Sequence, residues 1–541
     1  MPDIQNHETG LSRRNFLKGG VAAGAMVAAG ASLFGCSSTG SAAQSAAEFK
    51  PDESYDVVVV GGGSAGQQIA RTVTEAGLTC AVLEVMEPVV GPYVDKPLPD
   101  NASYRTEASH NIGGIGGDVQ PHWTAEDCLK GVLGDTGPDG PVDFLTTICE
   151  NAGEAYRLLT ELGIKYRETS FDPDSGDPTG FVNDKMGAGI LEALSNAAEA
   201  QGSVTQYGIR ARSLVQDANG RVIGLVAESA DGGDEKTYGA EYAVVLACGG
   251  WLMNGELLKH FGNVKNMDHM WCNVGSFEQG DGFLMGMSVN AAPWFVGLGH
   301  EPHGTMTRDR VRFFEGSADD LVFSKTVSMG NLLVNKDGVR FVDESAANGA
   351  VICPAILQQP GFFSYCIYND EMREKCGNSV AGGIDFGPIT PDVPHYSGET
   401  LEDLGKAIAA GEPGFNVEQF LATVDAWNAA VDVGVDDRFR RKMPEAPISL
   451  RDSGPYYCSV TMAGSIVPGG GLRIDGKTGH VLNWPDLEPI PGLIATGGTA
   501  GVRGTKGAAK GFNAIKGIAG SIAFARTILD EAGVDWTPYV R

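Results

Sequence analysis

The chain has few basic side chains for its length and no paired cysteine motif. Across 541 residues it carries 40 Lys and Arg against 68 Asp and Glu, a formal net charge of −28. A surface this acidic repels phosphate backbones, so no nucleic-acid partner is expected. None of the ten cysteines belongs to a CxxC or CxxCH motif, so iron–sulfur clusters and attached c-type haem are not supported. Their spacing fits buried thiols better than a disulfide framework, and no metal site is predicted.

Long apolar runs are also scarce. The run Gly19–Gly35 is 17 residues long and rich in Ala and Gly, which is short for a membrane-spanning helix. It follows Ser12–Lys18 (Ser-Arg-Arg-Asn-Phe-Leu-Lys), a twin-arginine pattern. Such signals are addresses for export, typically of proteins that fold with their cofactor already bound. Residues 1–36 are therefore predicted to direct export by the twin-arginine route to the periplasm or cell surface, and a single-pass anchor is the alternative.

The end of this leader resembles a bacterial lipobox. In Leu33-Phe34-Gly35-Cys36, the cysteine would become the lipidated first residue of the mature protein. The alternative is cleavage a few residues later, within Ser37–Ala47. Residues 37–53 are predicted to be a flexible tether, so a lipid anchor at Cys36 would hold the protein at the membrane.

Glycine is abundant, and the 76 glycines cluster inside apolar strands. Asp56–Val60 is an apolar strand that leads into the loop Gly61–Gly66 (Gly-Gly-Gly-Ser-Ala-Gly). Helical periodicity follows over Gln67–Ala76, and a second strand, Cys80–Leu83, ends on Glu84. This β-α-β order predicts the start of a parallel, doubly wound α/β sheet.

The loop has the chemistry of a dinucleotide site. Gly61 permits the tight turn, Gly63 lets the backbone approach a pyrophosphate, and Gly66 allows close packing of helix on strand. The helix that begins at Ser64-Ala65 would direct unpaired N–H groups at the phosphates. Glu84 stands 23 residues after Gly61, where an acid would bond ribose hydroxyls.

The pattern of the sequence changes twice after this β-α-β unit. Gly208–Glu228 reads as a hairpin around Asn219-Gly220. The stretch from Phe295 to about Pro468 reads as a mixed α+β insertion. Further elements are expected at Ala243–Ala247, Leu332–Asn335, Glu399–Ala409, Val417–Val431, Leu472–Asp475, Gly492–Gly498 and Asn513–Asp530.

Two glycine-containing strand ends carry a family resemblance. Pro491–Gly498 looks like the strand that closes FAD-binding folds beside the flavin, and Ala247–Gly250 resembles their middle element. With these, the chain resembles, over roughly residues 54 to 530, the flavoprotein subunits of fumarate reductases and succinate dehydrogenases, with urocanate reductase and 3-ketosteroid dehydrogenase as relatives. Other landmarks of the resemblance are Gly280-Asp281-Gly282, Asn331–Asn335, Gly338–Glu344 and Asn513-Ala514-Ile515.

The resemblance implies FAD, and hydride transfer between flavin N5 and an activated C=C bond. It also implies a Rossmann-like FAD-binding domain of the glutathione reductase type, with an inserted α+β capping domain. The expected bounds are residues 54–295 and 469–541 for the FAD-binding domain, and 296–468 for the capping domain.

The resemblance further implies a set of FAD contacts. His110, followed by Gly116 and Gly117, matches the spacing at which some family members tether FAD covalently to histidine. A histidine that only lines the flavin pocket, or an unrelated surface histidine, are the alternatives. The other expected cofactor contacts are Gly497, Lys510, Asn513, Ala514 and Ile515.

The departures from the family pattern concern acid chemistry and carboxylate binding. The position of the family's proton-donating arginine falls on Asn348, and the relay that feeds it falls near Ser324 and Val327. The carboxylate-binding histidine and arginine fall near Val467 and near Ala509 or Lys510. A dicarboxylate needs charge-assisted donors at both ends, so fumarate and succinate are not expected substrates.

Several residues are candidates to replace the missing groups. Tyr457, next to Tyr456, is a possible acid, or else both rings pack at the interface between cap and flavin. His300 is the plausible equivalent of the family's earlier capping-domain histidine. Arg308, in a cluster with Arg310, Arg312 and His303, reaches substrate or lies on a solvated turn. Arg503 and Lys510 would meet flavin oxygens or substrate, or else phosphate or the surface.

These features predict an exported, FAD-dependent oxidoreductase acting on CH–CH groups. It would reduce a C=C bond of a small organic acceptor less anionic than fumarate, such as an enone, an aryl acrylate or a steroid-like ring. Because the chain has no haem, iron–sulfur or second dinucleotide motif, electrons would come from a separate quinol dehydrogenase or cytochrome. Two alternatives remain, namely a ketosteroid-type dehydrogenase that runs oxidatively and a non-catalytic, ligand-binding flavolipoprotein.

Overall fold

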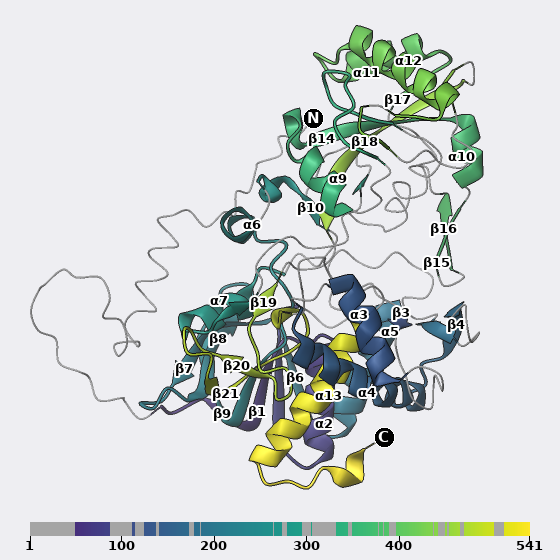
Figure 1. The fold of residues 1–541 in the computed structure, drawn as a ribbon. Helices are drawn as coiled ribbons and strands as arrows, with labels where there is room; N and C mark the ends of the chain where they lie inside the picture. The colour runs from purple at the N-terminus through teal and green to yellow at the C-terminus, as the bar shows by residue number, and fades with distance from the viewer. Residues whose placement is uncertain are drawn as a thin grey trace, which may run out of the picture.

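The computed structural model describes residues 49–86, 111–113, 124–136, 140–171, 178–183, 186–262, 265–272, 278–294, 304–305, 332–344, 349–376, 378–381, 384–388, 396–436, 438–441, 449–451, 454–465, 470–501 and 513–540. Figure 1 shows two bodies, one built on a mostly parallel sheet and one on a smaller sheet above it.

The larger sheet is built from an N-terminal and a C-terminal part of the described chain. Its strands run in the order β20-β21-β9-β1-β2-β6, and the hairpin β7–β8 extends it from β9. From β21 to β6 every neighbouring pair is parallel, as the β-α-β pattern predicts. The strand bounds are β1 (Glu53–Val60), β2 (Cys80–Glu84), β6 (Val204–Tyr207), β7 (Ile209–Gln216), β8 (Val222–Ser229), β9 (Glu235–Leu246), β20 (His480–Leu482) and β21 (Pro489–Ala495).

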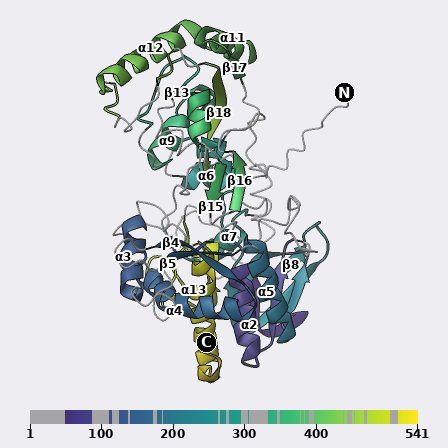
Figure 2. The ribbon, with the colours of Figure 1, turned by 90° about the vertical axis from the view of Figure 1, so that its right-hand side faces the viewer.

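Some helices, including α2, α7 and α13, pack against this sheet, and others pack against those helices, because each buries an apolar face. In α2, the buried face includes Ile69, Ala70 and Val73. The C-terminal helix α13 packs against both α2 and α4 (Figures 1 and 2), while α5 packs against α2 and α3 against α4. The bounds are α2 (Ser64–Glu75), α3 (Ala125–Thr136), α4 (Val142–Glu161), α5 (Met186–Ala200), α6 (Gly255–Phe261), α7 (Asp281–Ser288) and α13 (Asn513–Glu531).

The second body is formed by residues that lie, in the sequence, between strands β9 and β21 of the larger sheet. Its sheet runs β10-β18-β14-β13, with β12 and β17 also paired to β18. The strand bounds are β10 (Trp271–Cys272), β12 (Gly304–Thr305), β13 (Leu332–Val334), β14 (Phe363–Asn369), β17 (Tyr396–Gly398) and β18 (Tyr456–Ser465). Its helices are α9 (Gly349–Ile356), α10 (Asp370–Cys376), α11 (Leu401–Gly411) and α12 (Val417–Val433). The sequence predicts that the capping domain begins at residue 296. Because β10 ends at Cys272, this sheet also includes residues before that boundary.

Small sheets and short 3-10 helices complete the described elements. The sheets are β3 (Asn111–Gly113), β4 (Tyr166–Phe171) and β5 (Pro178–Asn183); β15 (Asn378–Ala381) and β16 (Ile384–Pro388); and β11 (Pro293–Trp294) with β19 (Gly471–Leu472). The 3-10 helices are η1 (Met267–His269), η3 (Pro360–Phe362), η4 (Gly497–Thr499) and η5 (Thr537–Tyr539).

Most of the elements expected from the sequence are present. The hairpin around Asn219-Gly220 is confirmed as β7–β8, and Gly220 has a positive φ of 81° that suits the turn. The predicted helices at 399–409 and 417–431 are confirmed as α11 and α12. The strand expected at Leu472–Asp475 is the short β19, which ends at Leu472. In the described part of the chain, no helix is both long and apolar enough to cross a membrane.

Candidate functional site

The site lies at the carboxyl ends of three adjacent parallel strands. Val60 of β1 pairs with Leu246 of β9, and Leu246 pairs with Ala495 of β21. The turns that follow these strands, at Gly61, Ala247 and Thr496, therefore leave the sheet at the same level. In open α/β sheets, ligands bind at this edge.

The turn after β1 has room for backbone alone. Gly61 has a φ of +105°, and its N–H donates to the carbonyl of Leu83 at 2.8 Å. A Cβ on Gly61 would lie 2.5 Å from the carbonyl oxygen of Ala247, and one on Gly66 would overlap the carbonyl oxygen of Gly61. Glycine at both positions is therefore a steric requirement of the turn, as the sequence predicts.

The turn ends at an uncapped helix N-terminus. Gly63 is the extended N-cap of α2 and provides no side-chain hydrogen bond, and the first turn of α2 contains no acidic residue. The first N–H groups of a helix have no intrahelical acceptor, and the helix dipole favours negative charge there. The start of α2 at Ser64-Ala65 is thus suited to bind an anion such as a pyrophosphate.

Glu84 anchors this turn from the end of β2. Its side chain accepts hydrogen bonds from the N–H groups of Gly62, at 2.6 Å, and Met86, at 2.9 Å. The residue is only 5% exposed. A carboxylate oxygen has more than one lone pair, so the group can hold Gly62 and still accept a ribose hydroxyl.

The turn after β21 docks onto the other two. Gly497 has a φ of +59°, and a Cβ there would lie 3.0 Å from the Cβ of Ala65. Thr499 donates its hydroxyl to the carbonyl of Gly249 at 3.0 Å. A Cβ on Gly498 would lie 3.2 Å from the carbonyl carbon of Gly249, so a larger residue there would require the turn to shift.

The predicted cofactor residues divide into two groups. The structure brings together Gly61, Gly63, Ser64, Ala65, Gly66, Glu84 and Gly497. Asn513, Ala514 and Ile515 open α13, which reaches the same place, since a Cβ on Gly517 would lie 3.6 Å from the Cβ of Ala65. The residues named from the sequence that lie outside the described part of the chain are Cys36, His110, Gly116, Gly117, His300, His303, Arg308, Arg310, Arg312, Ser324, Val327, Asn348, Val467, Arg503, Ala509 and Lys510.

Helix α7 also lies at the site. Its residue Asp281 belongs to a landmark seen in the sequence, whereas the partner of Asp281, Arg210, does not. A Cβ on Gly282 would lie 2.6 Å from Sγ of Cys248, so α7 begins against the turn after β9. Asp281 is held by both Nε and Nη2 of Arg210, each at 2.8 Å, and this hydrogen bonding raises the pKa of Arg210. The Gly-Asp-Gly landmark marks α7 in the sequence, but no local signal marks Arg210 as its partner. Burial raises the pKa of the Cys248 thiol to about 12, so this cysteine is not a ready nucleophile.

Tyr457 lies near the start of β18, in the sheet of the second body. Its hydroxyl donates to Oδ1 of Asp370 at 2.9 Å, and the residue is the second of β18. The opposite end of β18, at Ser465, precedes Gly471, which packs against the carbonyl oxygen of Thr499. Eight residues of extended strand span about 26 Å. The hydroxyl of Tyr457 is engaged by a carboxylate of the second body.

Two residues of the Gly338–Glu344 landmark, Arg340 and Glu344, belong to a buried ionic cluster in the second body. Arg340 contacts Glu344 at 2.6 Å and Asp436 at 2.9 Å, and Arg441 contacts Glu344 at 3.2 Å. Both guanidinium groups lie over the ring of Trp427, at 5.1 and 4.6 Å from its centroid. The cluster therefore connects the segment after β13 with the end of α12. The two arginines neutralise the charges of Glu344 and Asp436.

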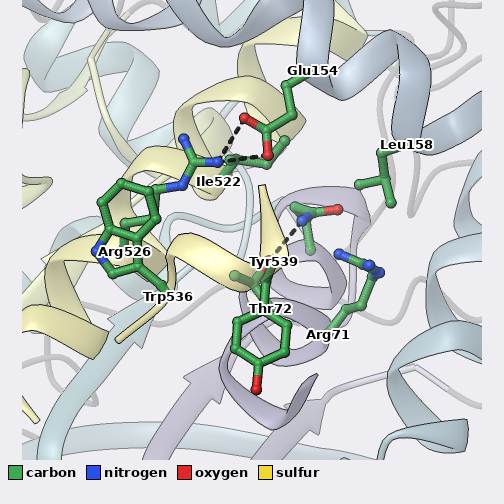
Figure 3. Close-up of a pocket in the computed structure, with 9 residues that line it drawn as sticks. Arg71, Thr72, Glu154, Leu158, Ile522, Arg526, Trp536 and Tyr539 are labelled. Atoms are coloured by element: carbon green, nitrogen blue, oxygen red, sulfur yellow. Dashed lines mark hydrogen bonds and ion pairs between the residues drawn. The ribbon is translucent and has the colours of Figure 1, made fainter. Parts of the chain in front are cut away.

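A pocket lined by residues of α2, α4 and α13 is held together by contacts within the helical layer. It lies between α2, α4, α13 and the C-terminal residues Trp536 and Tyr539 (Figure 3). Arg526 contacts both carboxylate oxygens of Glu154, at 2.5 and 2.6 Å, and lies over Trp536. These charged groups pair with each other, and none of the residues that line the pocket belongs to the glycine turns. The described residues also contain no cluster of His, Cys, Asp and Glu suited to a metal ion.

Comparisons with known proteins agree with this geometry. The family model described as "FAD binding domain" matches residues 56–518, and a model of the twin-arginine translocation signal sequence matches residues 10–30. A probable fumarate reductase of Shewanella frigidimarina is 28% identical over 496 residues, which cover 90% of this chain and 76% of the relative. Urocanate reductase of Eggerthella lenta is 28% identical over 461 residues, which cover 82% of this chain and 70% of the relative.

A solved structure shows the same fold. The 3-ketosteroid Δ1-dehydrogenase of Sterolibacterium denitrificans aligns with a TM-score of 0.68 at 17% identity, covering 89% of this chain and 100% of that one. The residues that meet at the glycine turns fit FAD, because the turns leave space for backbone only, present helix N–H groups to an anion and place a carboxylate beside them.

Proposed function

The chain belongs to the family of proteins built on this FAD binding domain, and from that premise we propose that it is an exported oxidoreductase that reduces a C=C bond of an organic acceptor. The observation that carries the proposal is the convergence of the turns after β1, β9 and β21 on the N-terminus of α2, beside Glu84. When bound there, FAD supplies hydride transfer to or from carbon.

The chain's first task is to bind an anionic dinucleotide. The uncapped N–H groups at the start of α2 would donate to the pyrophosphate. Gly61 and Gly66 let the backbone approach it, and Glu84 would accept a ribose hydroxyl while it holds Gly62 in place. We propose that residues 54–295 and 469–541 perform this task and that residues 296–468 cover the bound flavin.

The acceptor that fits best is less anionic than fumarate. The two relatives described above are named for fumarate and urocanate, molecules that each contain a C=C bond conjugated to a carboxylate. Asn348 and Val467 provide no cation for a second carboxylate. The charges of Arg340 and Arg441 are already neutralised by Glu344 and Asp436. Because an unpaired carboxylate is expensive to bury, an enone, an aryl acrylate or a steroid-like ring is the better substrate.

The proton for the second carbon must come from a group within hydrogen-bond reach. His300, Arg308 and Arg503 are the proposed candidates on sequence grounds. Tyr457 is a weaker candidate, since its hydroxyl is engaged by Asp370 about 26 Å along β18 from the end that leads to the flavin site.

Electrons for the reaction are proposed to come from a separate carrier. The chain has no CxxCH or iron–sulfur motif and a single glycine loop of the dinucleotide type, so a quinol dehydrogenase or a cytochrome would reduce it. The export signal places the enzyme outside the cytoplasm, and we propose that a lipid on Cys36 holds it there. Cys36→Ala would then move the protein from the detergent phase to the aqueous phase on phase partitioning, while cleavage of the leader at a later residue would leave the partitioning unchanged.

Anaerobic reoxidation of the flavin tests the substrate class. The photoreduced holoenzyme is mixed with fumarate, a cinnamate, an enone and a 3-ketosteroid enone, and flavin absorbance is followed against free reduced FAD. We expect rapid reoxidation by at least one monoanionic or neutral acceptor and slow reoxidation by fumarate. Rapid turnover with fumarate alone would refute the inference drawn from Asn348 and Val467.

Two alternative functions predict different results in the same anaerobic flavin assay. The fold shared with a 3-ketosteroid dehydrogenase favours the oxidative direction as a second candidate, in which saturated ketosteroids would reduce the flavin in the presence of a dye. A ligand-binding flavolipoprotein would leave reduced flavin untouched by every acceptor and oxidised flavin untouched by every donor.

A further inference from the structure

Two buried thiols face each other between α3 and α4. Cys128 lies eight residues before the end of α3 at Thr136, and Cys149 lies seven residues after the start of α4 at Val142. At 1.5 Å per residue, the two are about 12 and 11 Å from the connection between the helices. The helices pack against each other, and the thiol of Cys128 contacts that of Cys149. Cys128 is 2% exposed and Cys149 is 4% exposed.

A second pair of neighbouring cysteines shows why this pair is distinct. Cys366 of β14 stands opposite Ser459 of β18, while Ile367 stands opposite Cys458. Because side chains alternate across a strand, Cys366 and Cys458 point to opposite faces of the sheet. Cys128 and Cys149 contact each other directly, and both are free thiols in the structure.

The export route exposes this pair to two redox environments. A twin-arginine signal directs the chain out of a cytoplasm in which thiols stay reduced, into a compartment in which disulfides form and persist. We propose that Cys128 and Cys149 are a modification site, which closes to an intramolecular disulfide after export by exchange with a protein or small-molecule disulfide. This inference is independent of the substrate proposed above.

The exchange balances in two steps. One cysteine thiolate attacks a sulfur of the donor disulfide, which forms a mixed disulfide and releases one donor thiolate. The second cysteine thiolate attacks the mixed disulfide at the protein sulfur, which forms the Cys128–Cys149 bond and releases the second donor thiolate. The two protein thiols lose two electrons and two protons, and the donor disulfide takes them up as two thiols.

The packing around α3 determines how the donor disulfide reaches the two buried thiols. Contact with Cys128 and burial both raise the pKa of the Cys149 thiol, so the closed hairpin reacts slowly. The other face of α3 is exposed at Glu126, Lys130 and Gly131, so the helix is held from one side only. Exchange therefore proceeds when α3 opens locally. Once formed, the bond pins the helix that follows the segment with the predicted flavin contacts Gly116 and Gly117.

Peptide mapping of the holoenzyme tests the proposal. Full-length, FAD-loaded protein is reduced, freed of reductant, incubated with oxidised glutathione, and alkylated with N-ethylmaleimide in denaturant. We expect a cross-linked species that joins the Cys128 and Cys149 peptides, with two fewer maleimide adducts and a mass about 2 Da below that of the two thiol peptides. Oxidation should also raise the melting temperature, and reductant should reverse the rise.

Two variants sharpen the result. Cys149→Ser should abolish both the cross-link and the rise in melting temperature, whereas Cys353→Ala, a change at another buried thiol, should retain both. Alkylation of both thiols after oxidation would overturn the proposal, as would a stable glutathione adduct on one of them or a disulfide from either to another cysteine. If Cys149→Ser does not fold, the peptide map of the unaltered chain decides alone.

Discussion

Replacing Glu84 by glutamine removes one acceptor from the turn that binds the dinucleotide. The carboxylate accepts from the N–H of Gly62 at 2.6 Å and from the N–H of Met86 at 2.9 Å, in a site that is 5% exposed. An amide has a single acceptor oxygen, so one of the two backbone N–H groups would face an NH₂ group instead. An unsatisfied buried donor costs about 1–3 kcal/mol. The part of this cost that arises only when FAD excludes water from the turn weakens binding, by at most about 5- to 150-fold in the Kd for FAD, and the rest lowers the stability of the deflavinated chain.

The assay is a fluorescence titration of deflavinated protein with FAD, together with the melting temperature of the deflavinated chain. Glu84→Gln should weaken FAD binding and also lower the melting temperature, because the hydrogen bonds exist within the protein itself. Glu256→Gln is the control, since that side chain is 69% exposed and should affect neither quantity. Wild-type affinity and melting temperature in Glu84→Gln would show that the carboxylate does not hold the turn.

Three further predictions concern packing, the ionic cluster and the proposed acid. Gly66→Ala should prevent FAD incorporation, measured as the flavin-to-protein absorbance ratio, because its Cβ would overlap the carbonyl oxygen of Gly61. Arg340→Met should lower the free energy of unfolding of the second body by about 3–5 kcal/mol in urea, because it removes the cation that pairs with buried Asp436 and one of the two that pair with Glu344. Burial raises the pKa of Asp436, but the hydrogen bonds and charge of Arg340 outweigh it and lower the pKa overall. The contribution of this pair is therefore complete above the unfolded carboxyl value of about 3.9, is lost as pH falls through the lower folded value, and should be missing from Arg340→Met. Tyr457→Phe should leave turnover near wild type, whereas a loss of about 10²-fold or more would identify the phenol as the acid.

Two control substitutions separate these effects from general damage. Gly131→Ala lies within α3, where a Cβ meets nothing within 4 Å, and should leave FAD content unchanged. Arg451→Ala breaks an ion pair with Asp432 whose side chains are 49% and 56% exposed, and should cost less than about 1 kcal/mol. A large effect of either control would contradict the steric or burial argument that it accompanies.

The sequence alone predicts the elements whose signals are local. The strand before Gly61, the helix after Ser64 and the acid at Glu84 belong to one unit of about 30 residues, so their order and spacing contain the prediction. The helices at 401–411 and 417–433 are predictable for the same reason, because their periodicity lies within each segment. The twin-arginine pattern is likewise read along the chain, and its assignment does not depend on the fold.

Contacts between distant segments were decided by the tertiary structure. Arg210 meets Asp281, and Arg340 meets Asp436, across 71 and 96 residues, and no periodicity reports such a partner. Tyr457 precedes the flavin segment closely in sequence, yet an extended strand places it at the far end of the second sheet. Cys128 and Cys149 read as scattered thiols until two packed helices bring them together. The glycine loop thus indicated a dinucleotide from its own residues, while the direction of strands and the packing of helices decided which side chains stand beside one another.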